Sequence, residues 1–511
     1  MKKIIIIGAG FAGLAVGSYL QMNGYETEIY EKHSIPGGLC TSWKRASYTF
    51  DGCIHYLVGS DKGSAFYKLW SELLELEEME FVNHSTRVFI ELKENTDKYG
   101  NKVFTLYSNV DKLERYLLDL SPEDRMPIKE FIDSIKFIQK YNLPPLIEKA
   151  PEVRNVFDRI KLITYIRVIK FLLKWNKITT MTFSERFKSK FLKEAFELLY
   201  EGQEYSVLFI AMQLAYFSSG SAGYPVGGSL ALSRRLEERY YKLGGKIKFN
   251  IGVSKVITEN NTAVGIQTKD NVVVHADTVI SAADWNFTVF KALEGKYTDN
   301  VITSLKNQKT FEVFESALLI SLGVSRAFEE TPHLLRFPLD EELKLEDGSK
   351  YNRMEAHIYN YDRTMAPEGK TTITVTLTTK NADYWIELRK NNYCNYKEIK
   401  DSIAQKVVNI LDNKFGNLKD KLEVVDVATP ATFNRYTGNW KGSMQGWMPQ
   451  NNLLSSSPVR NTLPGLKNFY MAGHWLVPGG GLPAALLSGR NLAQVICKND
   501  KKEFFCFKPK I

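Results

Sequence analysis

The sequence lacks several features that would assign it to a common class of protein. It holds no window of about 18 consecutive apolar residues, so no segment predicts a membrane-spanning helix. It shows no internal repeat period and no low-complexity tract, which argues against a repeat architecture. The 511 residues are 44% hydrophobic. A chain of this length is too long for one compact core, and we expect two domains.

Cysteine is scarce and scattered, and no pair has the CxxC spacing. The odd number argues against both a disulfide framework and a zinc site, and it favours a reducing, cytoplasmic location. Histidines show no ligand-like spacing either, so we expect no metal. The five cysteines are Cys40, Cys53, Cys394, Cys497 and Cys506.

Positive charge is concentrated in one stretch of a chain whose formal net charge is +9. Between residues 154 and 193, only Asp158 and Glu185 oppose the basic side chains. Aromatic and aliphatic residues alternate with them, which is typical of a helical core but also of an interfacial helix on an anionic membrane. No recognition motif for nucleic acid accompanies the charge, so we expect a peripheral membrane contact and no nucleic acid. The basic residues are Arg154, Arg159, Lys161, Arg167, Lys170, Lys174, Lys177, Arg186, Lys188, Lys190 and Lys193.

Strand and helix patterns divide the chain into alternating blocks. Residues 1–84, 225–290 and 425–511 carry strand–helix–strand patterns, and we expect them to form one discontinuous domain. Residues 85–224 and 291–424 show other patterns: a predicted hairpin, amphipathic helices and strand-like runs such as 371–379. The predicted fold is α/β: a discontinuous Rossmann-like dinucleotide-binding domain with an inserted α+β substrate domain.

A glycine loop follows the first apolar run, which spans Ile4 to Ile7 and predicts a buried parallel strand. Gly8 permits a tight turn, Gly10 lets the backbone approach a pyrophosphate, and Gly13 lets the next helix pack on the strand. The N-terminus of that helix would face the phosphates. Together with the residues between these glycines, the predicted phosphate-binding set is Gly8, Gly10, Phe11, Ala12 and Gly13.

An acidic residue ends the second predicted strand. Glu31 is placed to accept a hydrogen bond from an adenosine ribose, and it would repel a 2′-phosphate. NADP is therefore disfavoured, whereas NAD and FAD both stay open. Lys32 follows, and then Gly37, Gly38 and Leu39 stand where an NAD-binding domain would normally continue to its third strand. A glycine doublet there lets the backbone pass beside the pyrophosphate and ribityl chain.

The C-terminal block contains a second glycine loop that opens a helix. A predicted strand enters a turn at Gly473 and His474, and the run from Pro478 to Pro483 reads as a loop with a proline in the first helical turn. The positive end of that helix suits the negative charge of a reduced flavin ring. The predicted contacts here are Gly473, His474, Gly481, Leu482 and Pro483.

These motifs resemble, end to end, the phytoene desaturase, carotenoid isomerase and retinol saturase superfamily of glutathione-reductase-type flavoproteins. The segment from Phe50 to Tyr56 is similar to the retinol saturase version, whereas the run from Pro478 to Pro483 looks more like bacterial phytoene desaturases. The resemblance implies FAD as cofactor and adenine contact through the backbone of Val253. Many relatives carry an acidic residue where His474 stands.

The resemblance implies an FAD-dependent oxidoreductase that acts on C–C bonds of a hydrophobic polyene or isoprenoid lipid, as a desaturase, a saturase or a cis–trans isomerase. His55 and Tyr56 are candidate proton donors, and a packed, hydrogen-bonded pair is the alternative. No second dinucleotide fingerprint is present, which leaves the electron partner open. Two rival functions are a flavin amine oxidase and a non-catalytic lipid-binding escort resembling GDP-dissociation inhibitors.

Overall fold

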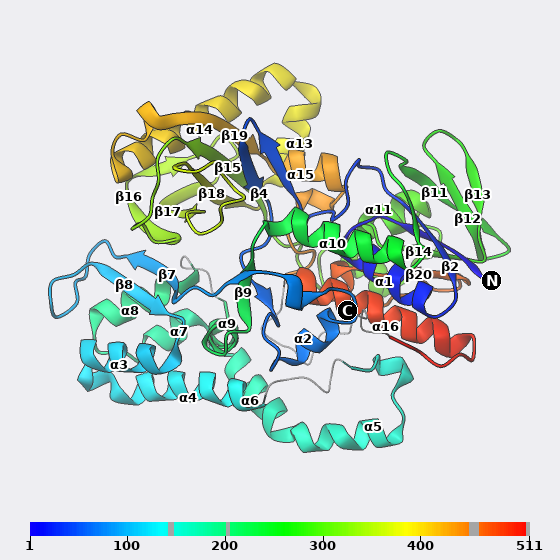
Figure 1. Cartoon of the computed structure of the whole chain (residues 1–511), viewed down its shortest axis with the longest axis horizontal. Coiled ribbons are helices and arrows are strands. Elements are labelled where there is room, and N and C mark those ends of the chain that lie inside the picture. The colour runs from blue at the N-terminus through cyan, green and yellow to red at the C-terminus, as the bar shows by residue number, and fades with distance from the viewer. Residues whose placement is uncertain (142–147, 201–204, 449–458, 507–511) are drawn as a thin grey trace.

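The computed structural model describes residues 1–141, 148–200, 205–448 and 459–506. Two large sheets, each covered by helices, form the body of the molecule (Figure 1). The first is a five-stranded parallel sheet, which confirms the predicted α/β class. In spatial order its strands are β10 (Lys246–Lys248), β2 (Glu26–Tyr30), β1 (Lys3–Ile7), β14 (Thr278–Ser281) and β20 (Phe469–Met471).

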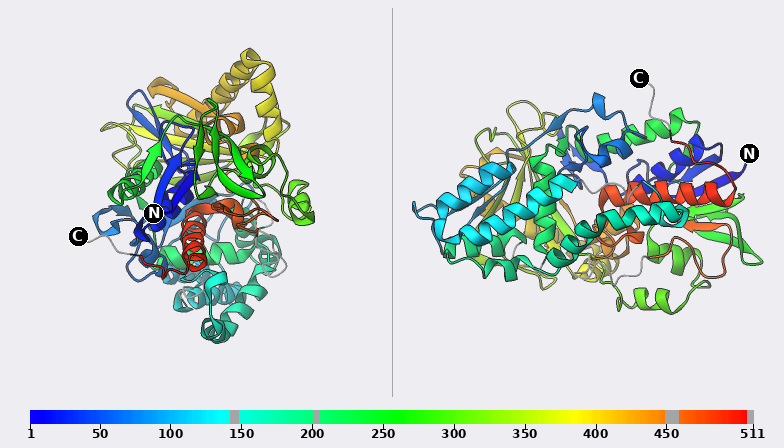
Figure 2. Two further views of the ribbon diagram at one scale, coloured as in Figure 1. Left: turned by 90° about the vertical axis from the view of Figure 1, so that its right-hand side faces the viewer. Right: turned by 90° about the horizontal axis from the view of Figure 1, so that it is seen from below.

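Strand β1 lies in the middle of this sheet because its β-branched side chains are buried on both faces. Ile4 to Ile6 have no exposed surface and Ile7 almost none. Ile4 and Ile6 join one core cluster and Ile5 and Ile7 another, as the alternation of side chains along a strand requires. Helix α1 (Phe11–Met22) packs beside helix α16 (Gly481–Asn499) and helix α10 (Gly228–Lys242) on one face of the sheet (Figures 1 and 2).

The second large sheet has seven strands, and it draws on two distant parts of the sequence. Strands β7 and β8 form the predicted hairpin, and β7 pairs parallel with β16. Helices α13 (Ala382–Asn391) and α14 (Tyr393–Phe415) bury apolar side chains against this sheet (Figure 1). In order the strands are β19 (Leu422–Ala428), β15 (Ser316–Val324), β18 (Thr371–Thr379), β17 (Lys350–Ile358), β16 (Leu334–Lys344), β7 (Thr86–Glu91) and β8 (Val103–Tyr107).

A helical layer packs beneath the β7–β8 hairpin with a core of its own. Val88 and Phe104 from the hairpin meet Phe131, Phe183 and other buried side chains of the helices. The layer lies at the lower left of Figure 1. Its helices are α3 (Val110–Leu120), α4 (Arg125–Tyr141), α6 (Ile166–Asn176), α7 (Thr180–Ser184), α8 (Lys190–Glu197) and α9 (Val207–Ser218). Helix α5 (Val156–Lys161) lies at the lower edge of the same view.

Smaller elements connect these layers. They comprise the hairpin of β3 (Ser42–Arg45) and β4 (Tyr48–Asp51), the sheet of β5 (Leu57–Val58), β9 (Ala222–Pro225) and β6 (Phe81–Val82), and the antiparallel sheet of β11 (Val253–Glu259), β12 (Thr262–Thr268) and β13 (Val273–His275). The predicted domain boundaries remain a prediction, and the one between residues 424 and 425 falls inside β19.

Within the described part of the chain, no helix combines the length and apolar character that crossing a membrane requires. The same residues contain no group of three or more His, Cys, Asp or Glu side chains arranged to hold a metal ion.

Candidate active site

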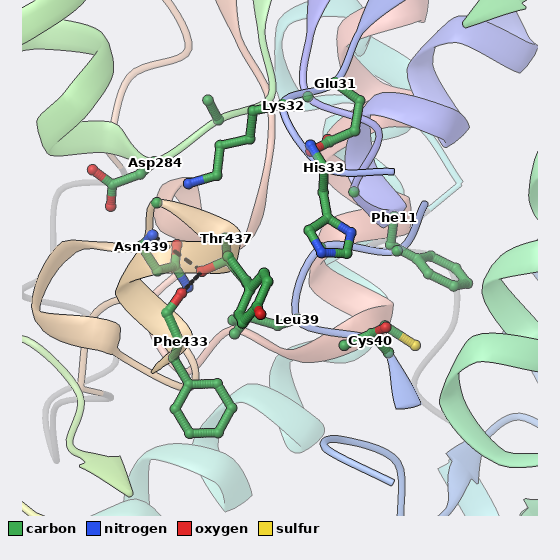
Figure 3. A pocket seen from close by; sticks show the side chains of 18 of the residues that line it. Phe11, Glu31, Lys32, His33, Leu39, Cys40, Asp284, Phe433, Thr437 and Asn439 are labelled. Carbon is green, nitrogen blue, oxygen red and sulfur yellow. Dashed lines mark hydrogen bonds between the residues drawn. The ribbon is translucent and has the colours of Figure 1, made fainter. Parts of the chain in front are cut away.

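A cavity of about 670 Å³ opens at the carboxyl ends of strands β1, β2 and β14. Ligands of open parallel sheets bind at this edge. Its walls come from the glycine loop, the end of β2, residues 35–43, the loop after β14, helix α15 (Pro430–Thr437) and the turn before α16. Figure 3 shows Phe11 on one side of the cavity and Phe433 from α15 on the other.

Two glycines of the loop have different roles. A Cβ built on Gly10 would meet nothing within 4 Å, so its backbone is bare toward the cavity. A Cβ on Gly13 would lie 2.0 Å from the carbonyl oxygen of Gly8, so any side chain there would force the strand and helix apart. Gly13 is a packing residue and does not line the cavity. Gly8 makes the turn with a φ of +99°, and its N–H donates to Tyr30 at 2.8 Å.

Glu31 is held at the end of β2 by two backbone hydrogen bonds. Oε2 accepts from the N–H of Ala9 at 2.7 Å, and Oε1 accepts from the N–H of His33 at 2.8 Å. The side chain is only 8% exposed. Burial raises the pKa of Glu31, and these two hydrogen bonds oppose the rise. The carboxylate therefore lies fixed in the cavity wall beside the glycine loop, as the sequence motif predicts for a ribose contact.

The residues after Glu31 cross in front of the glycine loop. The N–H of Gly37 donates to Ala9 at 2.9 Å, and both Gly37 and Gly38 adopt positive φ. A Cβ on Gly37 would lie 2.2 Å from the carbonyl oxygen of Cys40. Lys32 donates to the carbonyl of Arg435 at 2.8 Å, and burial lowers its pKa.

The far wall is formed by the turn before α16. Gly473 has a φ of +133°, and its N–H donates to Ser488 on α16 at 2.8 Å. The neighbouring His474 lines the cavity, and its Nε2 is buried without a hydrogen-bond partner among the described residues. Burial lowers the pKa of His474 to about 4, so its imidazole is neutral at pH 7. A neutral ring with a buried, unpartnered nitrogen fits a polar group of a bound ligand.

Most of the predicted cofactor contacts line this single cavity, although they come from four separate parts of the sequence. Besides Gly13, the exception is Pro483, which lies in the first turn of α16 and does not line the cavity. The predicted residues that line it are Gly8, Gly10, Phe11, Ala12, Glu31, Lys32, Gly37, Gly38, Leu39, Val253, Gly473, His474, Gly481 and Leu482.

Several residues in the walls were not predicted from the sequence. Asp284 follows β14, caps the next helical turn through a 2.7 Å bond from the N–H of Phe287, and accepts from the N–H of Trp440 at 2.8 Å. Burial raises the pKa of Asp284 to about 6. In Figure 3 the side chain of Lys32 extends toward Asp284, whose carboxyl group points away from it. Asp284 could have been found from the sequence, because it is an aspartate at a helix N-cap position directly after a predicted strand. No sequence pattern indicated Trp440.

His55 and Tyr56 do not line this cavity, although Cys53, two residues before His55, does. The ring of His55 stacks on His357 with centroids 4.3 Å apart. Burial, together with His357, lowers the pKa of His55 to about 3, so its cationic form is scarcely populated at pH 7. Tyr56 packs on Phe217, and burial raises its pKa, which keeps the phenol protonated. Their roles as proton donors remain a prediction.

A family model described as flavin-containing amine oxidoreductase matches residues 11–497, which is most of the chain, from the last part of the first glycine loop through the second glycine loop. The chain belongs to this family. The match confirms the flavoprotein relationship that the glycine motifs predicted, and it makes the chain a member of a family of flavin-dependent oxidoreductases.

Curated relatives resemble the chain over nearly its whole length. Prolycopene isomerase 2 of an Oncidium hybrid cultivar is 25% identical over 95% of this chain and 82% of its own. Phytoene desaturase (lycopene-forming) of Paracoccus sp. is 25% identical over 97% of both chains. All-trans-retinol 13,14-reductase of Danio rerio is 24% identical over 95% of this chain and 85% of its own. All three belong to the superfamily that the motifs resemble.

Solved structures show the same fold. An oxidoreductase from Methanosarcina mazei aligns with a TM-score of 0.56 and 18% identity, covering 96% of this chain and all of its own. A triple mutant of putrescine oxidase aligns with a TM-score of 0.57 and 14% identity, covering 98% and 99%. At such identities the likeness concerns the fold alone.

Proposed function

We propose that this protein is an FAD-dependent oxidoreductase acting on C–C bonds of an apolar polyene or isoprenoid lipid, as a desaturase, a saturase or an isomerase. The observation that carries the substrate class is the likeness, over at least 95% of the chain, to curated proteins whose names refer to carotenoids and retinol. The family as a whole is named for flavin and for amine oxidation, so the polyene assignment rests on these relatives.

Residues that line the cavity fit the groups of a bound dinucleotide. Gly10 leaves room for a pyrophosphate, because nothing fills the space above its Cα. Glu31 would accept a hydrogen bond from the adenosine ribose, and Val253, which lines the same cavity, would meet the adenine. The unpartnered Nε2 of His474 would contact the flavin half.

When bound, the flavin supplies hydride transfer to or from a substrate carbon. The chain would hold that group near the N-terminus of α16, a 19-residue helix whose free N–H groups would favour negative charge. Among the candidate proton donors, Tyr56 keeps its proton at neutral pH, whereas His55 is neutral and weakly basic. We therefore assign the proton-donor role in a saturation to Tyr56 before His55.

We also propose that the basic segment from 154 to 193 contacts an anionic membrane surface. On and near α5, apolar side chains project into solvent: Phe157 is 76% exposed, Val156 69% and Ile160 55%. Arg159 lies on the same short helix and Lys170 on α6, and both are exposed. Exposed apolar groups beside cations are the composition of an interfacial helix. The side chain of Lys161 lies outside the described residues.

The absorption spectrum of freshly purified protein tests the cofactor, and mass spectrometry of a lipid extract of the same sample tests the substrate class. We expect the two bands of an oxidised flavin, release of FAD on denaturation, and a co-purified polyene or isoprenoid. Protein that binds no flavin after incubation with FAD would overturn the enzyme assignment in favour of the lipid-binding escort. A flavoprotein that reacts with amines and binds no polyene would favour the amine oxidase.

A further inference from the structure

Four of the seven histidines gather in one place away from the dinucleotide cavity. They form two stacked pairs: His55 with His357, and His84 with His333, whose ring centroids lie 3.6 Å apart. His55 lies in the segment after β4, His84 and His333 lie just before β7 and β16, and His357 lies in β17. With three neighbouring side chains they form what we call the Arg87 cluster: His55, His84, His333, His357, Arg87, Tyr56 and Tyr200.

The acid that contacts this cluster is already neutralised. Glu355 forms an ion pair with Arg336 and accepts a hydrogen bond from Nε2 of His357 at 2.9 Å. Burial acts to raise the pKa of Glu355, but Arg336 and His357 outweigh it and hold that pKa well below its usual range. Glu355 is thus ionised, and its charge is balanced within the pair. It leaves no charge to compensate a further cation.

Arg87 has no such partner. Its guanidinium lies 5.6 Å from the ring centroids of both Tyr56 and Phe217. Its Nε is buried and makes no hydrogen bond, and no carboxylate pairs with the side chain among residues 1–141, 148–200, 205–448 and 459–506. Arg87 as a whole is partly buried, so its cation has lost part of its hydration without gaining an acid. Such a loss is costly unless an opposite charge or hydrogen bonds compensate for it.

Two further polar atoms of the cluster are buried without a described partner. They are Nε2 of His84 and the hydroxyl of Tyr200. Burial lowers the pKa of His84 to about 4 and that of His333 to about 2, and Arg87 contributes to both shifts. The imidazoles of His84 and His333 are therefore neutral at pH 7, and they stand beside the cation of Arg87. Buried polar atoms without a partner point to a missing hydrogen-bonding group.

One ring of the cluster is accessible to a ligand. The side chain of His55 is exposed, although it stacks on His357. The rings of Tyr56 and Phe217 flank Arg87 and supply apolar walls to the same region.

We propose that the Arg87 cluster binds a carboxylate at the polar end of the lipid substrate, with Arg87 as its counter-ion and Tyr200 and His84 as hydrogen-bonding partners. This inference rests on the proposed function and narrows its substrate class to polyene or isoprenoid carboxylic acids. A carboxylate is a monoanion whose two oxygens match the planar fork of a guanidinium. It supplies the counter-charge that Arg87 lacks among the described residues, whereas a hydroxyl carries no charge and a diphosphate would bring excess negative charge.

Binding to the flavin-loaded enzyme tests this assignment. The probes are all-trans-retinoic acid and all-trans-retinol, which share the polyene and differ in the polar end, together with an isoprenoid diphosphate. Quenching of tryptophan fluorescence reports each Kd. We expect the acid to bind about 30-fold more tightly than the alcohol, because the alcohol cannot form the charge pair with Arg87. Arg87→Met should abolish that preference and leave the Kd of the alcohol unchanged, and Tyr200→Phe should weaken binding of the acid several-fold.

Controls separate binding from folding. Arg363→Met removes an exposed arginine and should keep the preference for the acid. Arg87→Met should retain the flavin and the melting temperature of the wild type, because Arg87 makes no ion pair that the fold would lose. Equal affinity of the wild type for acid and alcohol, tighter binding of the diphosphate, or an undiminished preference in Arg87→Met would each overturn the carboxylate site. Failure of the proposed function would appear differently, as absence of polyene turnover with the binding preference intact.

Discussion

Replacing Gly10 with valine should separate cofactor binding from folding. Gly10 is the N-cap of α1, with φ −69° and ψ 173°, an extended conformation that valine adopts without strain. A Cβ at this position meets no protein atom within 4 Å, so the added side chain enters the cavity and not the core. It would occupy the space that we assign to the pyrophosphate.

The magnitude follows from that geometry. Valine is a poorer N-cap than glycine, and we expect the apoprotein to lose about 1 kcal/mol or less of unfolding free energy. Cofactor affinity should fall by roughly 100-fold or more, about 2.7 kcal/mol, because the pyrophosphate loses its close backbone approach. FAD at about 100 times its Kd stabilises the wild type by about 2.7 kcal/mol, and the variant should lose most of this increment.

The assay is titration of apoprotein with FAD, followed by flavin fluorescence, beside thermal unfolding with and without FAD. Gly24→Ala is the matched control: Gly24 follows the other end of α1 at a φ of +75°, so alanine strains the backbone but leaves the cavity and the Kd unchanged. Gly13→Ala should fail to fold normally, because its Cβ would lie 2.0 Å from Gly8. Wild-type FAD affinity in Gly10→Val would refute the reasoning.

Three further predictions follow. Burial raises the pKa of Asp284 to about 6 in the folded protein. Protonated Asp284 therefore adds to the free energy of unfolding below the pKa of the unfolded chain. This contribution, about 3 kcal/mol in all, is lost as the pH rises from about 4 to 6. The free energy of unfolding of the wild type should fall across this pH range relative to that of Asp284→Asn. Parallel pH profiles of the two proteins would contradict the prediction. Tyr56→Phe should slow saturation roughly 10²-fold while flavin reduction is unchanged, with a smaller loss for His55→Ala; equal rates in wild type and both variants would remove the proton-donor roles. The protein should sediment with anionic liposomes at low salt and be released at high salt. Charge reversal at Lys170, Lys174 and Lys177 should weaken this association without loss of flavin. Equal recovery with neutral vesicles would contradict the membrane contact.

The sequence was sufficient to predict an element or a site residue wherever a local pattern determines the structure. The four isoleucines of residues 4–7 became β1, the run 371–379 became β18, and the acid at the end of β2 lies in the cavity wall. Such signals work because strand alternation, glycine conformations and helix caps depend on neighbours in the chain. Residues 334–344 carry Pro338, and a proline argues against an interior strand, yet β16 pairs with both β17 and β7. The register shift after Pro338 accommodates it.

Contacts between distant segments could not be predicted in this way. The walls that α15 and Trp440 add to the cavity depend on how the seven-stranded sheet sits against the parallel one. The Arg87 cluster joins residues 55 to 357, and the pairing of β16 with β7 is what brings His84 and His333 together. No spacing in the sequence reveals that Arg87 lacks an acid, because only the folded chain shows what surrounds it.

The most direct test of the account is anaerobic reaction of the photoreduced enzyme and of the oxidised enzyme with a panel of carotenoids and retinoids, analysed by chromatography, beside reaction of the oxidised enzyme with simple primary amines. The account predicts that at least one polyene double bond is saturated or isomerised by the reduced enzyme, or introduced by the oxidised enzyme, and that amines do not reduce the flavin. An unchanged polyene panel together with rapid amine-dependent flavin reduction would contradict it.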